Sequence, residues 1–262
     1  MDMRPPPGVS GAELRGPGDP SAAAVADPAW PPYSYAFQPI VDAVARRVVS
    51  YEALVRGARA EPAGLVLRSV AAQWRFAFDQ ASRETALALS AQLGYGGRLN
   101  LNFLPQAPDD AARALARTAD QAARHGIALD RLVIEVTEEE AIEDPAGLAG
   151  RLNEYRGRGM AVAIDDFGAG YSGLNLLAEF QPDAIKVDMK LVRGIEGHGP
   201  RQAIVRAIAQ ACTDLGIDVI AEGVETQAEF EWFAELGVRF FQDYLFARPA
   251  FEQFAPVQFP PR

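Results

Sequence analysis

Short apolar runs alternate with helical patterns through most of this chain, and no other feature restricts its fold as strongly. Strand-like runs cover residues 37–42, 48–56, 99–103, 132–136, 160–164, 183–187, 217–221 and 239–241. Helical periodicity covers residues 63–70, 76–93, 109–125, 144–156, 174–180, 201–215 and 227–236. Strands that alternate with helices form parallel sheets. Roughly eight of them in about 230 residues predict a closed (β/α)8 TIM-like barrel rather than an open sheet.

Length and composition allow one such barrel. Of the 262 residues, 49% are hydrophobic, which is enough for a large core. Residues 1–32 hold eight of the 19 prolines, with glycine and alanine between them. We predict that residues 1–32 are a disordered leader and that residues 33–262 form the folded domain.

Charge and cysteine usage limit the partners and the compartment. The formal net charge of −10 disfavours binding to DNA or RNA duplexes and to membrane surfaces. No apolar run is long enough to predict a membrane span. The single cysteine, Cys212, excludes an internal disulfide and favours a reducing compartment, so we expect a cytoplasmic protein. Cys212 lies in a helical pattern, which indicates a core residue rather than a nucleophile.

The stretch from Met160 to Leu174 combines a buried-strand pattern with two adjacent acids and three glycines. Asp165 and Asp166 follow the apolar run directly. Neighbouring side chains of a strand point to opposite faces, so both acids cannot enter a barrel from within a regular strand. At a strand end they can diverge around one point and hold one or two cations. Taken alone, the stretch is more typical of a solvated strand end followed by a turn.

Other predicted strands end in the same way. Reading the carboxyl end of each strand gives a set of acids, amides and one lysine: Glu52, Asn100, Glu135, Asp165 with Asp166, Lys186, Glu222 and Gln242. In a parallel barrel these ends share one rim, where the active sites of this fold lie. A charged side chain within a buried strand is costly unless it is paired or binds a metal. One such residue could be structural, but a converging set predicts a site.

The set contains oxygen ligands and neither histidine nor cysteine. Hard oxygen ligands favour Mg²⁺ or Mn²⁺ over Zn²⁺. Five carboxylates exceed the needs of one ion, so we expect two ions bridged by Asp165. Two such ions activate water and stabilise an in-line displacement at phosphorus. Lys186 would orient the attacking hydroxide or bind a phosphate oxygen, and Arg56 also suits a phosphate.

Several motifs occur at these strand ends in a fixed order. They read FQPIVD at 37–42, YEALVR at 51–56, LNLNF at 99–103, IEVTE at 134–138, AIDDFGAGYSGL at 163–174, DAIKVD at 183–188, AEGVET at 221–226 and FQDYLFARP at 241–249. Together they resemble the EAL domains, bacterial enzymes that hydrolyse cyclic di-GMP. FDQASR at 78–83, NFLPQA at 102–107 and RQAIV at 201–205 look most like EAL domains attached to blue-light-sensing flavin modules. These 262 residues contain no such module, so light sensing is not implied.

The resemblance implies a role for each matching residue. Metal ligands would be Glu52, Asn100, Glu135 and Asp165 at one site, and Asp165, Asp166 and Glu222 at a second. Lys186 matches the lysine beside the attacking water, and Glu222 has also been assigned as general base in such proteins. Substrate-site residues would be Gln38, Leu54, Arg56, Glu225 and Gln242. The implied reaction opens one phosphodiester of cyclic di-GMP and gives linear pGpG.

The resemblance also implies an EAL-type barrel with room for one antiparallel strand, and a homodimer. The segment from Asp166 to Gly173 matches a loop that couples the site to the dimer interface. Glu138 matches the residue that anchors this loop.

One position departs from the family pattern: Gln242-Asp243-Tyr244 stands where EAL domains usually have Gln-Gly-Tyr. The extra carboxylate could repel a phosphate or disturb Gln242, or it could point outward at little cost. An alternative hypothesis is therefore a non-catalytic EAL domain that binds cyclic di-GMP or a protein as a regulator. A more remote one is a metal-dependent barrel lyase or aldolase, which the fold permits.

Overall fold

The computed structural model describes residues 30–104, 108–138, 145–170 and 173–260. Eight strands close a barrel: β1 (Tyr33–Asp42), β2 (Arg47–Gly57), β3 (Arg98–Asn102), β4 (Leu132–Thr137), β5 (Ala161–Phe167), β6 (Ala184–Val187), β7 (Asp218–Ala221) and β8 (Phe240–Gln242). Their order in the sheet is β2-β3-β4-β5-β6-β7-β8-β1, and β1 pairs back to β2. The predicted (β/α)8 barrel is confirmed. Residues 1–29 of the predicted leader lie outside the described residues, and Trp30 packs edge-on against Phe78.

One strand of the barrel is antiparallel to its neighbours. β1 pairs antiparallel with both β2 and β8, whereas the pairs from β2–β3 to β7–β8 are parallel. The reason is the short connection from Asp42 to Arg47, because a parallel crossover needs a dozen or more residues. Asp42 accepts hydrogen bonds from the backbone amides of Val44 and Ala45, which fixes this turn.

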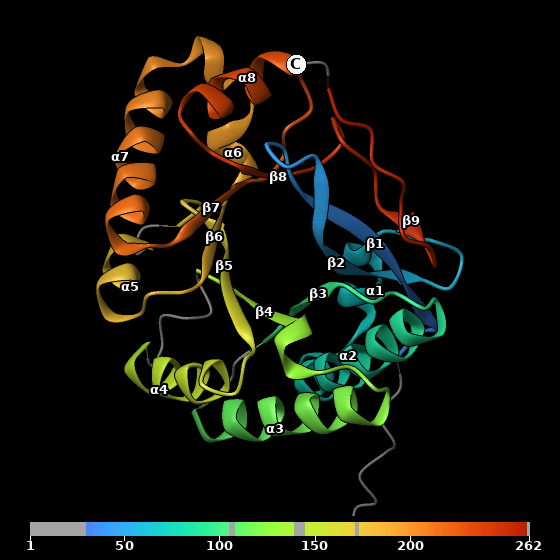
Figure 1. Cartoon of the computed structure of the whole chain (residues 1–262). Coiled ribbons are helices and arrows are strands. Elements are labelled where there is room, and N and C mark those ends of the chain that lie inside the picture. The colour runs from blue at the N-terminus through green and yellow to red at the C-terminus, as the bar shows by residue number, and fades with distance from the viewer. Residues whose placement is uncertain (1–29, 105–107, 139–144, 171–172, 261–262) are drawn as a thin grey trace, which may run out of the picture.

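Helices surround the strands (Figure 1): α1 (Ala63–Ser69), α2 (Arg75–Gln92), α3 (Pro108–Arg124), α4 (Pro145–Arg156), α5 (Gly173–Glu179), α6 (Met189–Val192), α7 (Gly199–Leu215) and α8 (Gln227–Glu235). The predicted helices agree with these bounds to within two residues. The four-residue α6 was not predicted, because so short a segment shows no periodicity. None of the described helices combines the length and the apolarity that crossing a bilayer requires.

The C-terminal segment covers the side of the barrel formed by the β1–β2 hairpin (Figure 1). Its short strand β9 (Ala250–Phe251) pairs with β1 outside the closed ring. Phe254 then packs against Phe37, Tyr51 and Tyr95, with ring centroids 4.4 to 4.8 Å apart. This segment supplies apolar cover where no helix connects two consecutive strands.

The strands bury apolar side chains toward the helices and leave polar ones for the lumen. In β4, Ile134 and Val136 belong to the main hydrophobic core, while the intervening Glu135 is also buried but does not. Alternation along a strand places Glu135 on the opposite face, inside the barrel. The same alternation in the neighbouring strands determines which side chains meet there.

Candidate active site

The strand register brings the predicted site residues onto the inner face of the barrel. Glu52 lies opposite Asn100, Asn102 lies opposite Glu135, and Thr137 lies opposite Asp165. Directly paired residues share a face of the sheet, as do alternate residues of one strand. The acids and amides of β2 to β5 therefore point into one lumen, although Glu52 lies in the middle of its strand rather than at its end.

Lys186 is the centre of this cluster. Its side chain is fully buried, and its Nζ lies 3.0 Å from Glu52 Oε2, 3.0 Å from Asp165 Oδ1, 3.3 Å from Glu222 Oε2 and 3.5 Å from Glu135 Oε2. Asn100 Nδ2 donates to Glu135 Oε1 at 2.7 Å, and Gln242 Nε2 donates to Glu52 Oε2 at 2.6 Å. One ammonium group thus faces four carboxylates.

This imbalance of charge shifts the protonation of the cluster. Burial, and then the neighbouring Glu52, raise the pKa of Glu135 well above its ordinary value. Burial also raises the pKa of Glu222, although the positive charge of Lys186 acts in the opposite direction. Burial alone would lower the pKa of Lys186, but the surrounding carboxylates outweigh it and raise that pKa. The carboxylates need positive charge beyond that of one lysine in order to ionise together.

The donor atoms fit hard divalent cations. Glu52, Glu135 and Asp165 each offer a carboxylate oxygen within 4.8 Å of the others, and in the described part of the chain they form the one group of three such ligands. The buried oxygen Asn100 Oδ1 has no hydrogen-bond partner. Unpaired buried acceptors are costly, and a cation would satisfy them.

The two adjacent acids lie within β5 rather than after it. The strand continues to Phe167, and its pairing with β6 shifts register between Ile164 and Phe167. Asp166 has a left-handed backbone with φ of 53°, so this bulge lets the two acids diverge. Asp165 is buried beside Lys186, whereas Asp166 is exposed. Although the residue is exposed, partial desolvation of its carboxyl group, and then the charges of Asp165 and Asp188, raise the pKa of Asp166 to about 6.

Glu138 connects the end of β4 to the glycine-rich loop after β5. It is buried, and its Oε2 accepts from the amide of Gly168 at 2.9 Å. Its own amide donates to the carbonyl of Asp165 at 3.2 Å. A Cβ at Gly170 would lie 3.1 Å from Glu138 Oε1, so this residue approaches closely as well. Residues 171–172 of the loop lie outside the described residues.

The predicted substrate residues occupy different parts of the rim. Gln38 Nε2 donates to Asp243 Oδ1 at 3.0 Å, and Gln38 lies beside Gln242. Leu54 lines a separate cavity of about 520 Å³ next to β2, α1 and α2. Arg56 is half-buried and donates to the carbonyl of Val55.

Glu225 stands apart from the lysine-centred cluster. Its carboxylate forms an ion pair with Arg193 at 2.7 Å. The sequence reasoning missed Arg193, because it follows a four-residue helix outside any predicted strand end. It also missed Asn102, which donates to Glu52 Oε1 at 3.1 Å. The position of Asn102 two residues after Asn100 on one strand was the available signal.

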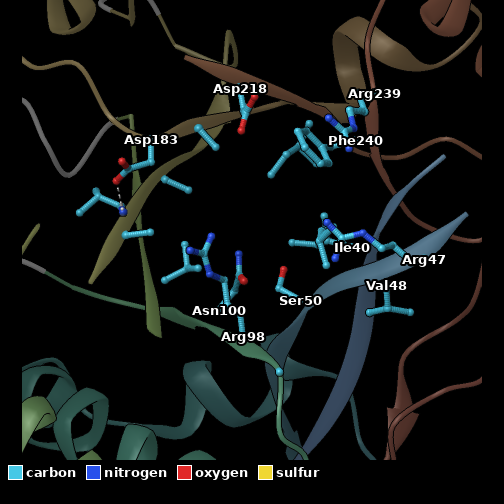
Figure 2. Close-up of a pocket in the computed structure, with 18 of the residues that line it drawn as sticks. Ile40, Arg47, Val48, Ser50, Arg98, Asn100, Asp183, Asp218, Arg239 and Phe240 are labelled. Atoms are coloured by element: carbon cyan, nitrogen blue, oxygen red, sulfur yellow. Dashed lines mark hydrogen bonds between the residues drawn. The ribbon is translucent and has the colours of Figure 1, made fainter. Parts of the chain in front are cut away.

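The opposite end of the barrel contains a cavity of about 720 Å³ (Figure 2). Small residues, among them Ala161, Ala163 and Ala184, leave this space between the strands. The charged residues along its lining are Arg47, Arg98, Asp183, Asp218 and Arg239. Asn100 also lines this cavity and separates it from the acidic cluster.

An eight-stranded barrel with one antiparallel strand and an acidic, lysine-centred lumen defines the class of this protein. The chain belongs to the EAL domain family, whose sequence model matches residues 33–249. The resemblance stated from the motifs is thereby confirmed.

Known relatives support the same assignment. The blue light- and temperature-regulated antirepressor BluF of Escherichia coli K12 is 32% identical over 227 residues, which are 86% of this chain and 56% of BluF. BlrP1 of Klebsiella pneumoniae, in a complex with calcium and cyclic di-GMP, superposes with a TM-score of 0.80 at 42% identity over 86% of this chain and 58% of its own. This chain therefore spans a little over half the length of these relatives.

A standalone EAL protein of Vibrio cholerae O395, in its cyclic di-GMP-bound form, matches over nearly its whole length. The superposition has a TM-score of 0.79 at 41% identity and covers 86% of this chain and 95% of that protein.

Proposed function

We propose that this chain hydrolyses one phosphodiester bond of cyclic di-GMP and releases linear pGpG, with divalent metal ions as cofactors. The observation that carries the proposal is the cluster of four carboxylates around Lys186, beside a buried and unpartnered oxygen on Asn100. Cyclic di-GMP is the ligand named for BlrP1, which is bound there with calcium or with manganese. Relatives named as cyclic di-GMP phosphodiesterases include PdeR of Escherichia coli, 40% identical over 116 residues.

Two Mg²⁺ or Mn²⁺ ions fit the donor set. The residues that would hold them are Glu52, Asn100, Glu135 and Asp165 for one ion, and Asp165, Asp166 and Glu222 for the other. Such ions neutralise phosphate charge and lower the pKa of bound water.

Lys186 and Glu222 would handle the attacking water. The Lys186 ammonium group can donate to the attacking oxygen and fix its direction toward phosphorus. Burial raises the pKa of Glu222, so its carboxylate is a better proton acceptor than an exposed one. Glu222 Oε2, which lies 3.3 Å from Lys186 Nζ, is the atom that would take this proton.

The rim residues would bind the rest of the substrate. Arg56 suits a phosphate oxygen, and the side chains of Gln38, Glu225 and Gln242 would offer hydrogen-bond partners at other parts of the rim. The cavity of about 520 Å³ lined by Leu54 also contains Phe78 and the Asp79 carboxylate. Its lining also includes Arg68, Arg75 and Arg83, and the Asp79 carboxylate pairs with Arg83.

We also propose a cytoplasmic homodimer. Glu138 holds the backbone of Gly168, so a partner that contacts the loop after β5 would act on Asp165 and Asp166 directly.

The test is hydrolysis of cyclic di-GMP by the purified protein with Mg²⁺, Mn²⁺ or EDTA, with pGpG measured by chromatography. We expect turnover with either metal and none with EDTA. Glu52→Ala should abolish it, because that change removes a carboxylate bonded to Lys186, Asn102 and Gln242. Undiminished turnover by Glu52→Ala, or by wild type in EDTA, would contradict the proposal.

A second candidate is a regulator that binds cyclic di-GMP or a protein without hydrolysis. In its favour, the relative BluF, which aligns with most of this chain, is named as an antirepressor. Retained binding of cyclic di-GMP without pGpG formation in either metal would favour it. Failure to bind any cyclic dinucleotide would instead favour a barrel enzyme acting on another phosphorylated compound.

A further inference from the structure

Asp243 occupies an unusual backbone position directly after Gln242. Its φ of 117° lies in a region that residues with a side chain rarely adopt, whereas glycine enters it without cost. The residue is 8% exposed, so its carboxylate is largely buried. A residue that keeps a strained backbone and a buried charge must be stabilised by specific contacts.

Those contacts begin a continuous series of hydrogen bonds that runs from Asp243 to Lys186. Asp243 Oδ1 accepts from Gln38 Nε2 at 3.0 Å, and Gln38 Oε1 accepts from Gln242 Nε2 at 3.5 Å. Gln242 Nε2 also donates to Glu52 Oε2 at 2.6 Å, and this oxygen accepts from Lys186 Nζ at 3.0 Å. The five residues are each at most 8% exposed. Water therefore does not compete for these bonds as it would at the surface.

This series of hydrogen bonds determines the orientation of the side-chain amide groups of Gln38 and Gln242. A carboxylate only accepts hydrogen bonds, so the NH₂ group of Gln38 must face Asp243. The second acceptor of this NH₂ group is the carbonyl of Ala247 at 3.3 Å. The carbonyl of Gln38 then faces Gln242, and the NH₂ group of Gln242 faces Glu52. The buried Gln242 Oε1 has no partner, although an unpaired acceptor is costly.

We propose that Asp243 is a positioning residue for metal binding, which acts through Gln38 and Gln242 to fix the orientation of the Glu52 carboxylate. The inference rests on the proposed function, because it takes Glu52 as a metal ligand. Glu52 Oε2 already accepts from Lys186 and Gln242, and Oε1 accepts from Asn102 at 3.1 Å. A carboxylate has about four acceptor positions, so Oε1 keeps acceptor capacity for a cation.

The negative charge of Asp243 is offset locally. Asp243 Oδ2 lies 3.9 Å from Arg193 Nη2, and the same guanidinium group pairs with Glu225 through both of its Nη atoms. One guanidinium group thus faces two carboxylates, so it offsets the charge of Asp243 only in part.

Two substitutions at this position separate positioning from stability. Asp243→Gly removes the acceptor for Gln38 and relieves the backbone strain, so metal affinity and thermal stability change in opposite directions. Asp243→Asn keeps an acceptor oxygen for Gln38 and keeps the strain. Loss of an outer-shell partner typically costs about 10- to 100-fold in metal affinity. Because the carbonyl of Ala247 still accepts from Gln38, we expect the lower end, about tenfold.

The experiment measures Mn²⁺ affinity by calorimetry and thermal unfolding by circular dichroism, both without cyclic di-GMP. We expect Asp243→Gly to bind Mn²⁺ about tenfold more weakly at an equal or higher melting temperature. Asp243→Asn should bind Mn²⁺ almost as the wild type does. In a Gln38→Met background, Asp243→Gly should cause no further loss, because the bonded chain is already broken.

Equal Mn²⁺ affinity of Asp243→Gly and wild type would overturn the inference, as would a loss in Asp243→Asn equal to that in Asp243→Gly. Failure of the proposed function gives a different result: wild type would bind Mn²⁺ but release no pGpG. Wild type that binds no Mn²⁺ would overturn both.

Discussion

The two ends of this barrel contain charged residues of opposite character. At the carboxyl end, four carboxylates surround one fully buried lysine, and burial raises the pKa of two of them, Glu135 and Glu222. At the amino end, Asp42 is buried but pairs with the half-exposed Arg239, and Asp183 pairs with Arg156. The carboxyl end has too few positive charges for its four carboxylates. At the amino end, Asp42 and Asp183 each have an arginine partner. Unbalanced charge indicates a ligand, whereas paired charge indicates structure.

The sharpest test of this contrast uses the two acids at opposite ends of β7. We expect Glu222→Gln to lower turnover of cyclic di-GMP by about 10³-fold, because it removes a proton acceptor and a metal ligand. Asp218→Asn, on the amino-end cavity, should leave turnover unchanged. Both are measured as pGpG formation at saturating Mn²⁺. A comparable loss in Asp218→Asn would break the distinction between the two ends.

Removing the positively charged side chain at each end of the barrel compares how much the two ends contribute to stability. Lys186→Met leaves four buried or half-buried carboxylates without their shared ammonium group, which should cost about 3 kcal/mol in metal-free protein. Arg239→Met removes a half-exposed guanidinium group from one acid and should cost much less. Urea unfolding in EDTA measures both. Equal losses would show that the carboxylates of the rim are protonated and need no cation.

The sequence predicted the fold and most of the rim, because both depend on local patterns. Helical and strand-like periods gave the element order, and polar residues inside apolar runs identified Glu52, Glu135 and Lys186. The bulge at Asp166 was not predictable, since the backbone there depends on pairing with β6. Nor was the pairing of Arg193 with Glu225, because loop residues meet without a periodic signal. The assigned roles of these residues remain predictions.

The two cavities also could not be predicted from the sequence. Leu54 was predicted from its motif as a substrate contact, but the adjoining space depends on α1 and α2 lying beside β2. The space at the amino end arises because small residues from neighbouring strands meet there. A void is set by side-chain volumes across several strands, so no single stretch of sequence reveals it.

Added metal should stabilise the carboxyl end specifically. A ligand at 100 times its dissociation constant stabilises the folded state by about 2.7 kcal/mol. We expect Mn²⁺ at that excess to raise the unfolding free energy of wild type and of Asp218→Asn by this amount. In Glu52→Gln, Mn²⁺ should raise the unfolding free energy little, because this variant lacks one of the three carboxylates that cluster at the site. An equal gain in Glu52→Gln would place the metal elsewhere.

The smallest effect concerns the paired acid of the amino end and depends on pH. Hydrogen bonds from Arg239, and then from the amides of Ala45 and Val44, outweigh burial and hold the pKa of Asp42 below its ordinary value of 3.8. A lowered pKa stabilises the fold above the ordinary value, and this contribution is lost as the pH falls through the folded-state pKa. Asp42→Asn should therefore destabilise the protein at pH 7 and have progressively less effect below pH 3.8.

The carboxyl end should show the opposite sign. Burial raises the pKa of Glu135, so its contribution is complete below its ordinary value of 4.5 and is lost as the pH rises. In EDTA, Glu135→Gln should thus gain stability relative to wild type between pH 4.5 and 7. Urea unfolding at several pH values measures both variants. Parallel pH profiles for Asp42→Asn and Glu135→Gln would show that the two ends do not differ in how their charges are compensated.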